Sequence, residues 1–89
     1  MPTIRLTGQL RRVLGAAELR SEAADLRGAL EEVRTRLGDR ASEVFEGAGE
    51  LKRPYVAAVN GKVVPREEYA QTALKPEDEV SIVGALAGG

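Results

Sequence analysis

One amphipathic stripe near the middle of the chain most constrains the fold. Apolar residues recur there at intervals of three and four, which is the repeat of one face of an α-helix. The stripe consists of Leu26, Ala29, Leu30, Val33 and Leu37. Asp25 stands where a helix N-cap belongs, and Gly38 stands where a helix ends. Because one helix cannot bury its own apolar face, we expect a sheet to cover it.

Two segments at opposite ends of the chain predict strands of that sheet. Residues 3–7 and 79–83 alternate polar and apolar side chains, which is the period of a half-buried strand. In the second segment, Val80 and Ile82 point one way and Val83 points the other.

A β-hairpin is predicted between them. Residues 54–59 are apolar on both faces, as in a strand inside a sheet. Asn60-Gly61 follows, and this dipeptide is the strongest short hairpin signal. Residues 62–64 form the short return strand.

The connections have weaker patterns. Residues 9–14 have helical spacing over about one turn. Residues 17–23 are interpreted as a second strand, although their composition suits a helix equally well. Residues 39–46 are expected to add a short helical turn that places Phe45 in the core, and residues 47–50 are interpreted as a loop.

The order of elements is strand, strand, helix, strand, short strand, strand. This order predicts an α+β fold of the β-grasp type, in which a mixed four- to five-stranded sheet packs on one main helix. The first and last strands then pair in parallel at the centre. We expect residues 1–83 to form this domain and residues 84–89 to form a flexible C-terminal tail.

The composition argues against several classes of function. The chain has no cysteine and no histidine, so it offers no thiolate metal site, no thiol nucleophile and no imidazole base. A net charge of −1 lacks the basic excess of a nucleic-acid-binding domain. No signal peptide is expected, and no apolar run approaches the ~18 residues of a membrane span. We therefore expect a cytoplasmic protein that is not an enzyme and binds no metal, cofactor, nucleic acid or membrane.

The final residues, Ala87-Gly88-Gly89, are the candidate functional site. Glycine loses the most conformational freedom on ordering, so a packed helix or strand does not favour this ending. At the average glycine content of roughly 7%, two glycines in the last two places are about a half per cent event. A segment without Cβ atoms fits a narrow channel and leaves the terminal carboxylate sterically open. We expect Gly89 to carry the chemistry.

Three stretches of the chain match a known pattern. Leu-Lys-Pro-Glu-Asp-Glu-Val-Ser-Ile at residues 74–82 runs on toward Leu-Ala-Gly-Gly at residues 86–89, and Ala-Val-Asn-Gly occupies residues 58–61. Together they resemble the end and the central hairpin of the bacterial sulfur-carrier proteins, which are ubiquitin-like. These are the molybdopterin synthase small subunit and its thiamine- and cysteine-pathway relatives. Gly84-Ala85 departs from this pattern, because the family often has prolines before the tail.

The resemblance implies a carrier function. In that family, a ubiquitin-activating-type adenylyltransferase uses ATP to adenylate the terminal glycine. A sulfur donor then displaces AMP and leaves a thiocarboxylate, which supplies sulfur to a biosynthetic enzyme. Carried over to this chain, Gly89 is the reacting residue, and Gly88, Ala87, Leu86 and Val83 contact the partners. Burial of Val83 in the core is an equal alternative.

Two other functions stay open. A ubiquitin-like protein modifier would use the same ending, with Gly89 joined to lysines of other proteins. A structural β-grasp interaction module would have an inert tail. The pathway that receives the sulfur is open as well, among molybdopterin, cysteine, thiamine, tRNA thiolation and natural-product synthesis.

Overall fold

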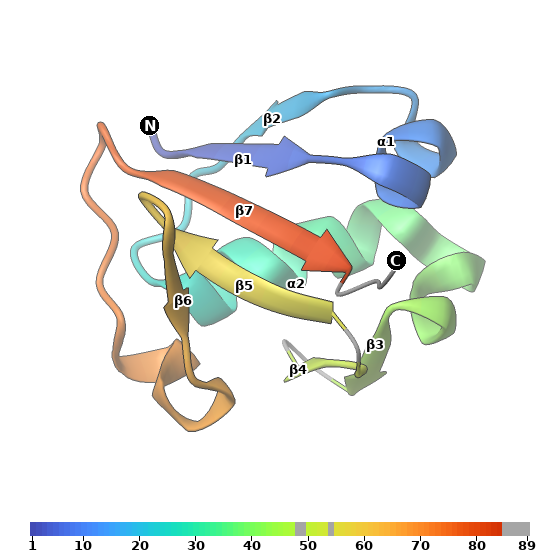
Figure 1. Ribbon diagram of the computed structural model, residues 1–89. Helices are drawn as coiled ribbons and strands as arrows, with labels where there is room; N and C mark the ends of the chain where they lie inside the picture. Colours follow the sequence, from blue (N-terminus) through green and yellow to red (C-terminus); the bar gives the residue numbers. More distant parts are fainter. Residues whose placement is uncertain (48–49, 54, 85–89) are drawn as a thin grey trace.

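The computed structural model describes residues 1–47, 50–53 and 55–84, and in it one face of a five-stranded sheet packs on a helix (Figure 1). The strands are β1 (Thr3–Leu6), β2 (Glu18–Arg20), β3 (Phe45–Gly47), β4 (Glu50–Leu51), β5 (Tyr55–Val59), β6 (Lys62–Val64) and β7 (Glu79–Gly84). The helices are α1 (Gly8–Leu14), α2 (Leu26–Leu37) and the 3-10 helices η1 (Gly38–Glu43) and η2 (Arg66–Gln71). The five-stranded sheet has the order β2-β1-β7-β5-β6, and β3 and β4 form a separate pair.

The first and last strands pair in parallel at the centre of the sheet, as predicted. The register of β1 and β7 runs from Thr3 opposite Glu79 to Leu6 opposite Ile82. On its other side, β7 pairs antiparallel with β5, where Tyr55 lies opposite Gly84. Hydrogen bonds therefore hold β7 on both edges. The strand ends at Gly84, one residue beyond the predicted end of the domain at residue 83.

The predicted helix covers the buried face of this sheet. All five residues of its apolar stripe are buried, and so are Ile4, Leu6, Val80 and Ile82 on the central strands. The Asp25 side chain accepts a hydrogen bond from the N–H of Gly28 at 2.8 Å, which confirms the N-cap. Gly38 ends the helix with a φ of +58°. The apolar residues that alternate along the strands and those of the helical stripe thus pack in one core.

Three predictions about the connections need correction. The second strand is only Glu18–Arg20, because pairing with β1 selects the three residues opposite residues 3–5. The interpretation of residues 47–50 as a loop is wrong at both ends, since Gly47 of β3 pairs with Glu50 of β4. Phe45 is buried as predicted, but it opens β3 opposite Leu51 instead of lying in a helical turn.

The β5–β6 hairpin is tied to the start of β7 through Asn60. Asn60 and Gly61 adopt φ angles of +52° and +86°, as a two-residue hairpin turn requires. The Asn60 side chain accepts from the N–H of Glu79 at 2.9 Å and donates to Asp78 at 2.9 Å. The other carboxylate oxygen of Asp78 accepts from the N–H of Lys75 at 2.8 Å. Residues 19 positions apart are thus connected at one corner of the sheet.

Replacing Asp78 by alanine is expected to lower the stability near neutral pH and to weaken its dependence on acid. The backbone N–H of Lys75 and the amide of Asn60 lower the pKa of the Asp78 carboxyl in the folded state. A lowered pKa stabilises the fold above the unfolded pKa, and this contribution is lost as the pH falls through the folded pKa. The difference between wild type and Asp78→Ala should therefore be full near pH 7 and shrink as the pH falls below about 4.

Urea unfolding near neutral pH and in acid measures this difference. Glu77→Ala, which removes an exposed carboxylate from the same turn, is the matched control and should change little. An effect of Asp78→Ala that stays constant across this pH range contradicts the assignment.

Candidate functional site

The candidate functional surface is the face of the five-stranded sheet that points away from α2, here called the open face. Along β7, Val80 and Ile82 are fully buried toward the helix, so the alternate residues Glu79, Ser81 and Val83 belong to the open face. Neighbouring strands contribute the residues opposite these three. The open face is therefore assembled from segments at both ends and in the middle of the chain.

One half of the open face is apolar. The side chain of Val83 is 41% exposed and that of Val63 is 64% exposed, which is unusual for valine in a sheet. Val56 lies opposite Val83, and Ala58 lies opposite both Ser81 and Val63. Val56, Ala58, Val63 and Val83 are called the apolar patch.

The exposure of Val83 decides between contact with a partner and burial in the core, because this residue is on the surface and not in the core. Val63 was not singled out from the sequence. It stands in a return strand of three residues, too short for alternation to show which side chain faces the solvent. A groove lined by Tyr55, Pro65 and Arg66, among others, opens beside Val56 and Val63.

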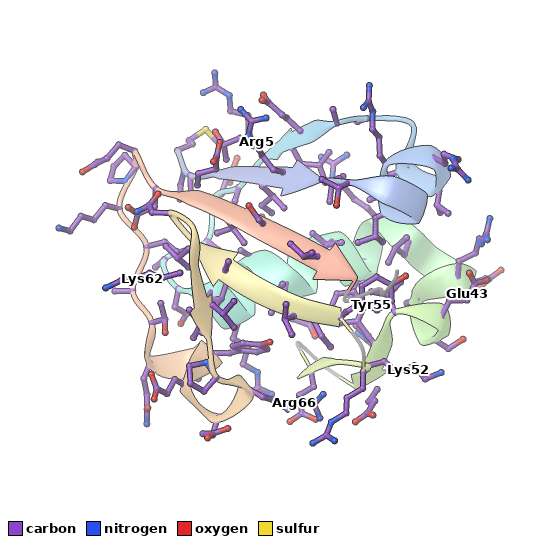
Figure 2. All side chains as sticks on the ribbon, viewed as in Figure 1. Arg5, Glu43, Lys52, Tyr55, Lys62 and Arg66 are labelled. Carbon is purple, nitrogen blue, oxygen red and sulfur yellow. The ribbon has the colours of Figure 1, made fainter. Side chains whose placement is uncertain are left out.

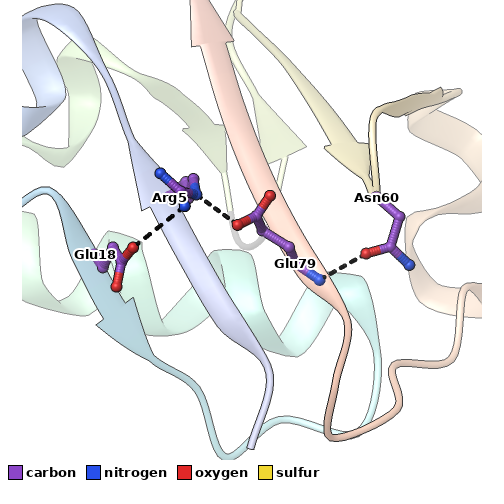
Figure 3. A network of polar contacts seen from close by, with 4 residues as sticks. All are labelled: Arg5, Glu18, Asn60 and Glu79. Atoms are coloured by element: carbon purple, nitrogen blue, oxygen red, sulfur yellow. Dashed lines mark hydrogen bonds and ion pairs between the residues drawn. The ribbon is translucent and has the colours of Figure 1, made fainter.

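The other half of the open face carries charges that pair with one another. Arg5 on β1 contacts Glu18 on β2 at 3.5 Å and hydrogen-bonds to Glu79 on β7 (Figure 3). The hydrogen bond and charge of Glu79, with the charge of Glu18, raise the pKa of Arg5 above its ordinary value. Such exposed pairs contribute little stability, but in them Arg5 offsets part of the negative charge of the two carboxylates. The apolar patch is then the part of the open face that gains most from being covered.

The end of β7 lies beside the patch. Gly84, the last residue of the strand, follows Val83 directly and pairs with Tyr55. The predicted site residues Leu86, Ala87, Gly88 and Gly89 lie outside the described residues. Of the five predicted site residues, the structure thus describes Val83, which is part of the apolar patch.

The described residues contain no group of three acidic, histidine or cysteine side chains that could hold a metal ion. In the same residues, no helix is long and apolar enough to cross a membrane.

Comparison with protein families matches residues 4–89 to the ThiS family. The chain belongs to this family of ubiquitin-like sulfur carriers. The match spans the β-grasp domain and continues through Gly89. Among curated proteins, no sequence matches this ThiS family chain significantly.

Solved structures confirm the β-grasp fold. The small archaeal modifier protein 1 from Methanosarcina acetivorans is 23% identical, with a TM-score of 0.82 over 99% of this chain and 95% of that one. A chain in the structure of the BexX/CysO complex from Amycolatopsis orientalis is 21% identical, with a TM-score of 0.80 over 100% of this chain and 100% of that one. A putative molybdopterin converting factor subunit 1 from Pyrococcus furiosus is 22% identical, with a TM-score of 0.67 over 96% and 97%.

Truncation of two neighbouring residues of β7 is expected to lower the unfolding free energy by very different amounts. Ile82→Ala removes a fully buried side chain and should cost about 2–5 kcal/mol of unfolding free energy. Val83→Ala shortens a surface side chain and should cost less than about 1 kcal/mol. Urea unfolding of both variants measures the contrast, and similar losses would show that Val83 belongs to the core.

Proposed function

We propose that this chain is a sulfur carrier whose Gly89 is converted to a terminal thiocarboxylate. The observation that carries the proposal is the match to the sulfur-carrier family, which extends through the Gly-Gly ending. The absence of cysteine supports it, because sulfur would then be carried on the main chain and not on a side chain.

The chemistry of a carboxylate explains why partners are required. A terminal carboxyl has a pKa of about 3.5, so near neutral pH it is an anion and a poor electrophile. An activating enzyme of the ubiquitin-activating type would join AMP from ATP to Gly89, and pyrophosphate would leave. A sulfur donor would then attack the acyl adenylate and AMP would leave, which gives the thiocarboxylate. The chain is the carrier in this scheme, and its cytoplasmic partners bind ATP and catalyse the steps.

The open face and the end of β7 suit a carrier chain that binds to catalytic partners. Residues 84–89 reach at most ~20 Å when fully extended. The apolar patch would dock on the surface of a partner, and Gly89 would reach into the partner's active site. The Amycolatopsis orientalis structure, in which CysO is in complex with BexX, supports docking of a carrier on a second protein.

Incubation with an activating enzyme, ATP and a sulfur source is expected to exchange one oxygen of Gly89 for sulfur. Intact-mass spectrometry detects this exchange. Deleting Gly89 should abolish the product without unfolding the domain, since β7 ends at Gly84. The proposal fails if the shortened chain still accepts sulfur.

Charges placed in the apolar patch are expected to weaken the complex with the activating enzyme. Val63→Asp and Val83→Asp should each raise its Kd at least about tenfold, because a buried carboxylate without a partner is costly. Arg20→Ser, on exposed β2 at the far edge of the same sheet, is the control and should leave Kd nearly unchanged. Titration calorimetry separates these outcomes, and equal effects of all three variants would exclude the patch as the docking surface.

A second candidate function is protein modification, which the small archaeal modifier protein 1 favours by its name and its similar fold. Gly89 would then form an amide bond with lysines of other proteins. Tagged chain isolated from cells and digested with a protease distinguishes the two functions. A peptide of this chain that ends in Gly89 and is joined to a lysine of another protein supports modification, whereas a thiocarboxylated terminus supports sulfur transfer.

A further inference from the structure

Two exposed arginines on α1, Arg11 and Arg12, form a local excess of positive charge. Among the described residues, no side chain or backbone group forms a hydrogen bond or an ion pair with either guanidinium. Residues 7–17 contain no acidic side chain that would offset the two charges. Four other arginines do pair with glutamates, namely Arg5, Arg34, Arg40 and Arg66.

The two arginines border an open depression in the surface. The rest of its lining consists of glycine and alanine, namely Gly8, Gly15, Ala16 and Ala17. A Cβ atom added at Gly8 or at Gly15 would meet no other atom within 4 Å, so both positions leave free space. A side chain of another molecule can therefore approach both arginines without steric hindrance.

A second pair of cations, Lys52 and Arg53, lies at the end of β7. Both side chains are exposed, and they come just before β5. The first residue of β5, Tyr55, pairs with Gly84 at the end of β7. Figure 2 shows Lys52 and Tyr55 at this end of the molecule. Arg53 also lines the groove beside the apolar patch, so this pair of cations adjoins that patch.

Helix α1 reaches the end of β7 from the other edge of the strand. Strands β1 and β7 are parallel, Leu6 lies opposite Ile82, and α1 begins two residues after Leu6 (Figure 1). A cavity connects the two sides, because Leu10 and Val13 of α1 and Tyr55 of β5 all line it. Two cations thus lie on each side of the end of β7, and the four are called the basic rim: Arg11, Arg12, Lys52 and Arg53.

The segment between these two pairs does not offset the charge of the basic rim. Residues 36–43, at the end of α2 and on η1, contain two arginines and two acidic residues. One arginine and one acid of this segment are paired, since Arg40 makes two hydrogen bonds of 3.1 Å to Glu43. The positive charge of the rim therefore remains uncompensated within the described residues around it.

We propose that the basic rim binds a cluster of carboxylates on the surface of a partner protein. Neighbouring cations repel one another, and acidic side chains of a partner relieve that repulsion. A protein surface fits the rim better than a nucleic acid does, because the rim adjoins the apolar patch and the whole chain has a net charge of −1.

The basic rim orients the domain before contact, with the end of β7 toward the acidic surface. Exposed charges act over about a Debye length, which is ~10 Å at 0.1 M ionic strength, and they change the association rate constant, kon, more than the dissociation rate constant. The apolar patch acts only after contact, when water leaves its surface. The inference rests on the proposed function in taking the activating enzyme as the partner.

Stopped-flow association kinetics with the activating enzyme test the proposal. In the double variant Arg11→Glu/Arg12→Glu, kon should fall at least about tenfold at an ionic strength of about 0.05 M, because the variant places two anions opposite the carboxylates of the partner. At about 0.5 M the fall should be less than about threefold, because salt screens exposed charges. The dissociation rate constant should change less than about threefold under both conditions.

The double variant Arg20→Glu/Lys75→Glu is the matched control. Arg20 and Glu79 both lie opposite Thr3, so Arg20 is level with the start of β7, and Lys75 lies in the turn before that strand. Each replacement lowers the net charge by two, so both double variants change it from −1 to −5. The control should leave kon within about threefold of the wild-type value.

Equal losses of kon in the two double variants overturn the proposal, because net charge and not its position then sets the rate. A wild-type kon that does not change with salt overturns it as well. Arg11→Gln/Arg12→Gln removes the charges without adding new ones and should lower kon at low salt by about threefold or more. Thiocarboxylate formed by the wild type at a saturating enzyme concentration tests the proposed function separately, because saturation removes the dependence on kon.

Discussion

The pairing of the first strand with the last strand is the interaction on which the rest of the structure depends. Strands β1 and β7 come from opposite ends of the chain, and together they place Ile4, Leu6, Val80 and Ile82 against the apolar stripe of α2. Because β5 holds the other edge of β7, the last strand cannot shift without breaking two ladders. The point where the chain leaves the sheet is therefore fixed relative to the core.

This fixed position matters for the proposed function. In that proposal, the domain would contribute a surface and a fixed strand end, and partner proteins would contribute the catalytic groups. The two halves of the open face differ: in the charged half Arg5 contacts Glu18 and Glu79, and in the apolar half Val63 and Val83 are exposed. Covering that half releases water from apolar surface, whereas the charged half would have to lose contacts it already has.

Local signals in the sequence predicted the elements that local interactions stabilise. The cap at Asp25 and the turn at Asn60-Gly61 depend on residues a few positions apart, so both appear in the structure where the sequence placed them. The strand pair β3–β4 was missed, because strands of two and three residues have no period to recognise. The ends of β2 were misjudged for a related reason, since only its pairing with β1 selects which residues become a strand.

The sequence by itself determined the β-grasp order of elements, the absence of cysteine and histidine, and the Gly-Gly ending, because each is a matter of residue types and their spacing. Tertiary structure alone decided that Val83 faces solvent, that Val63 lies on the same face with β5 between them, and that a cavity borders the end of β7. These features arise from strand register and from helix packing between residues distant in the sequence. Alternation shows that a strand has two faces, and only the position of α2 shows which of them is buried.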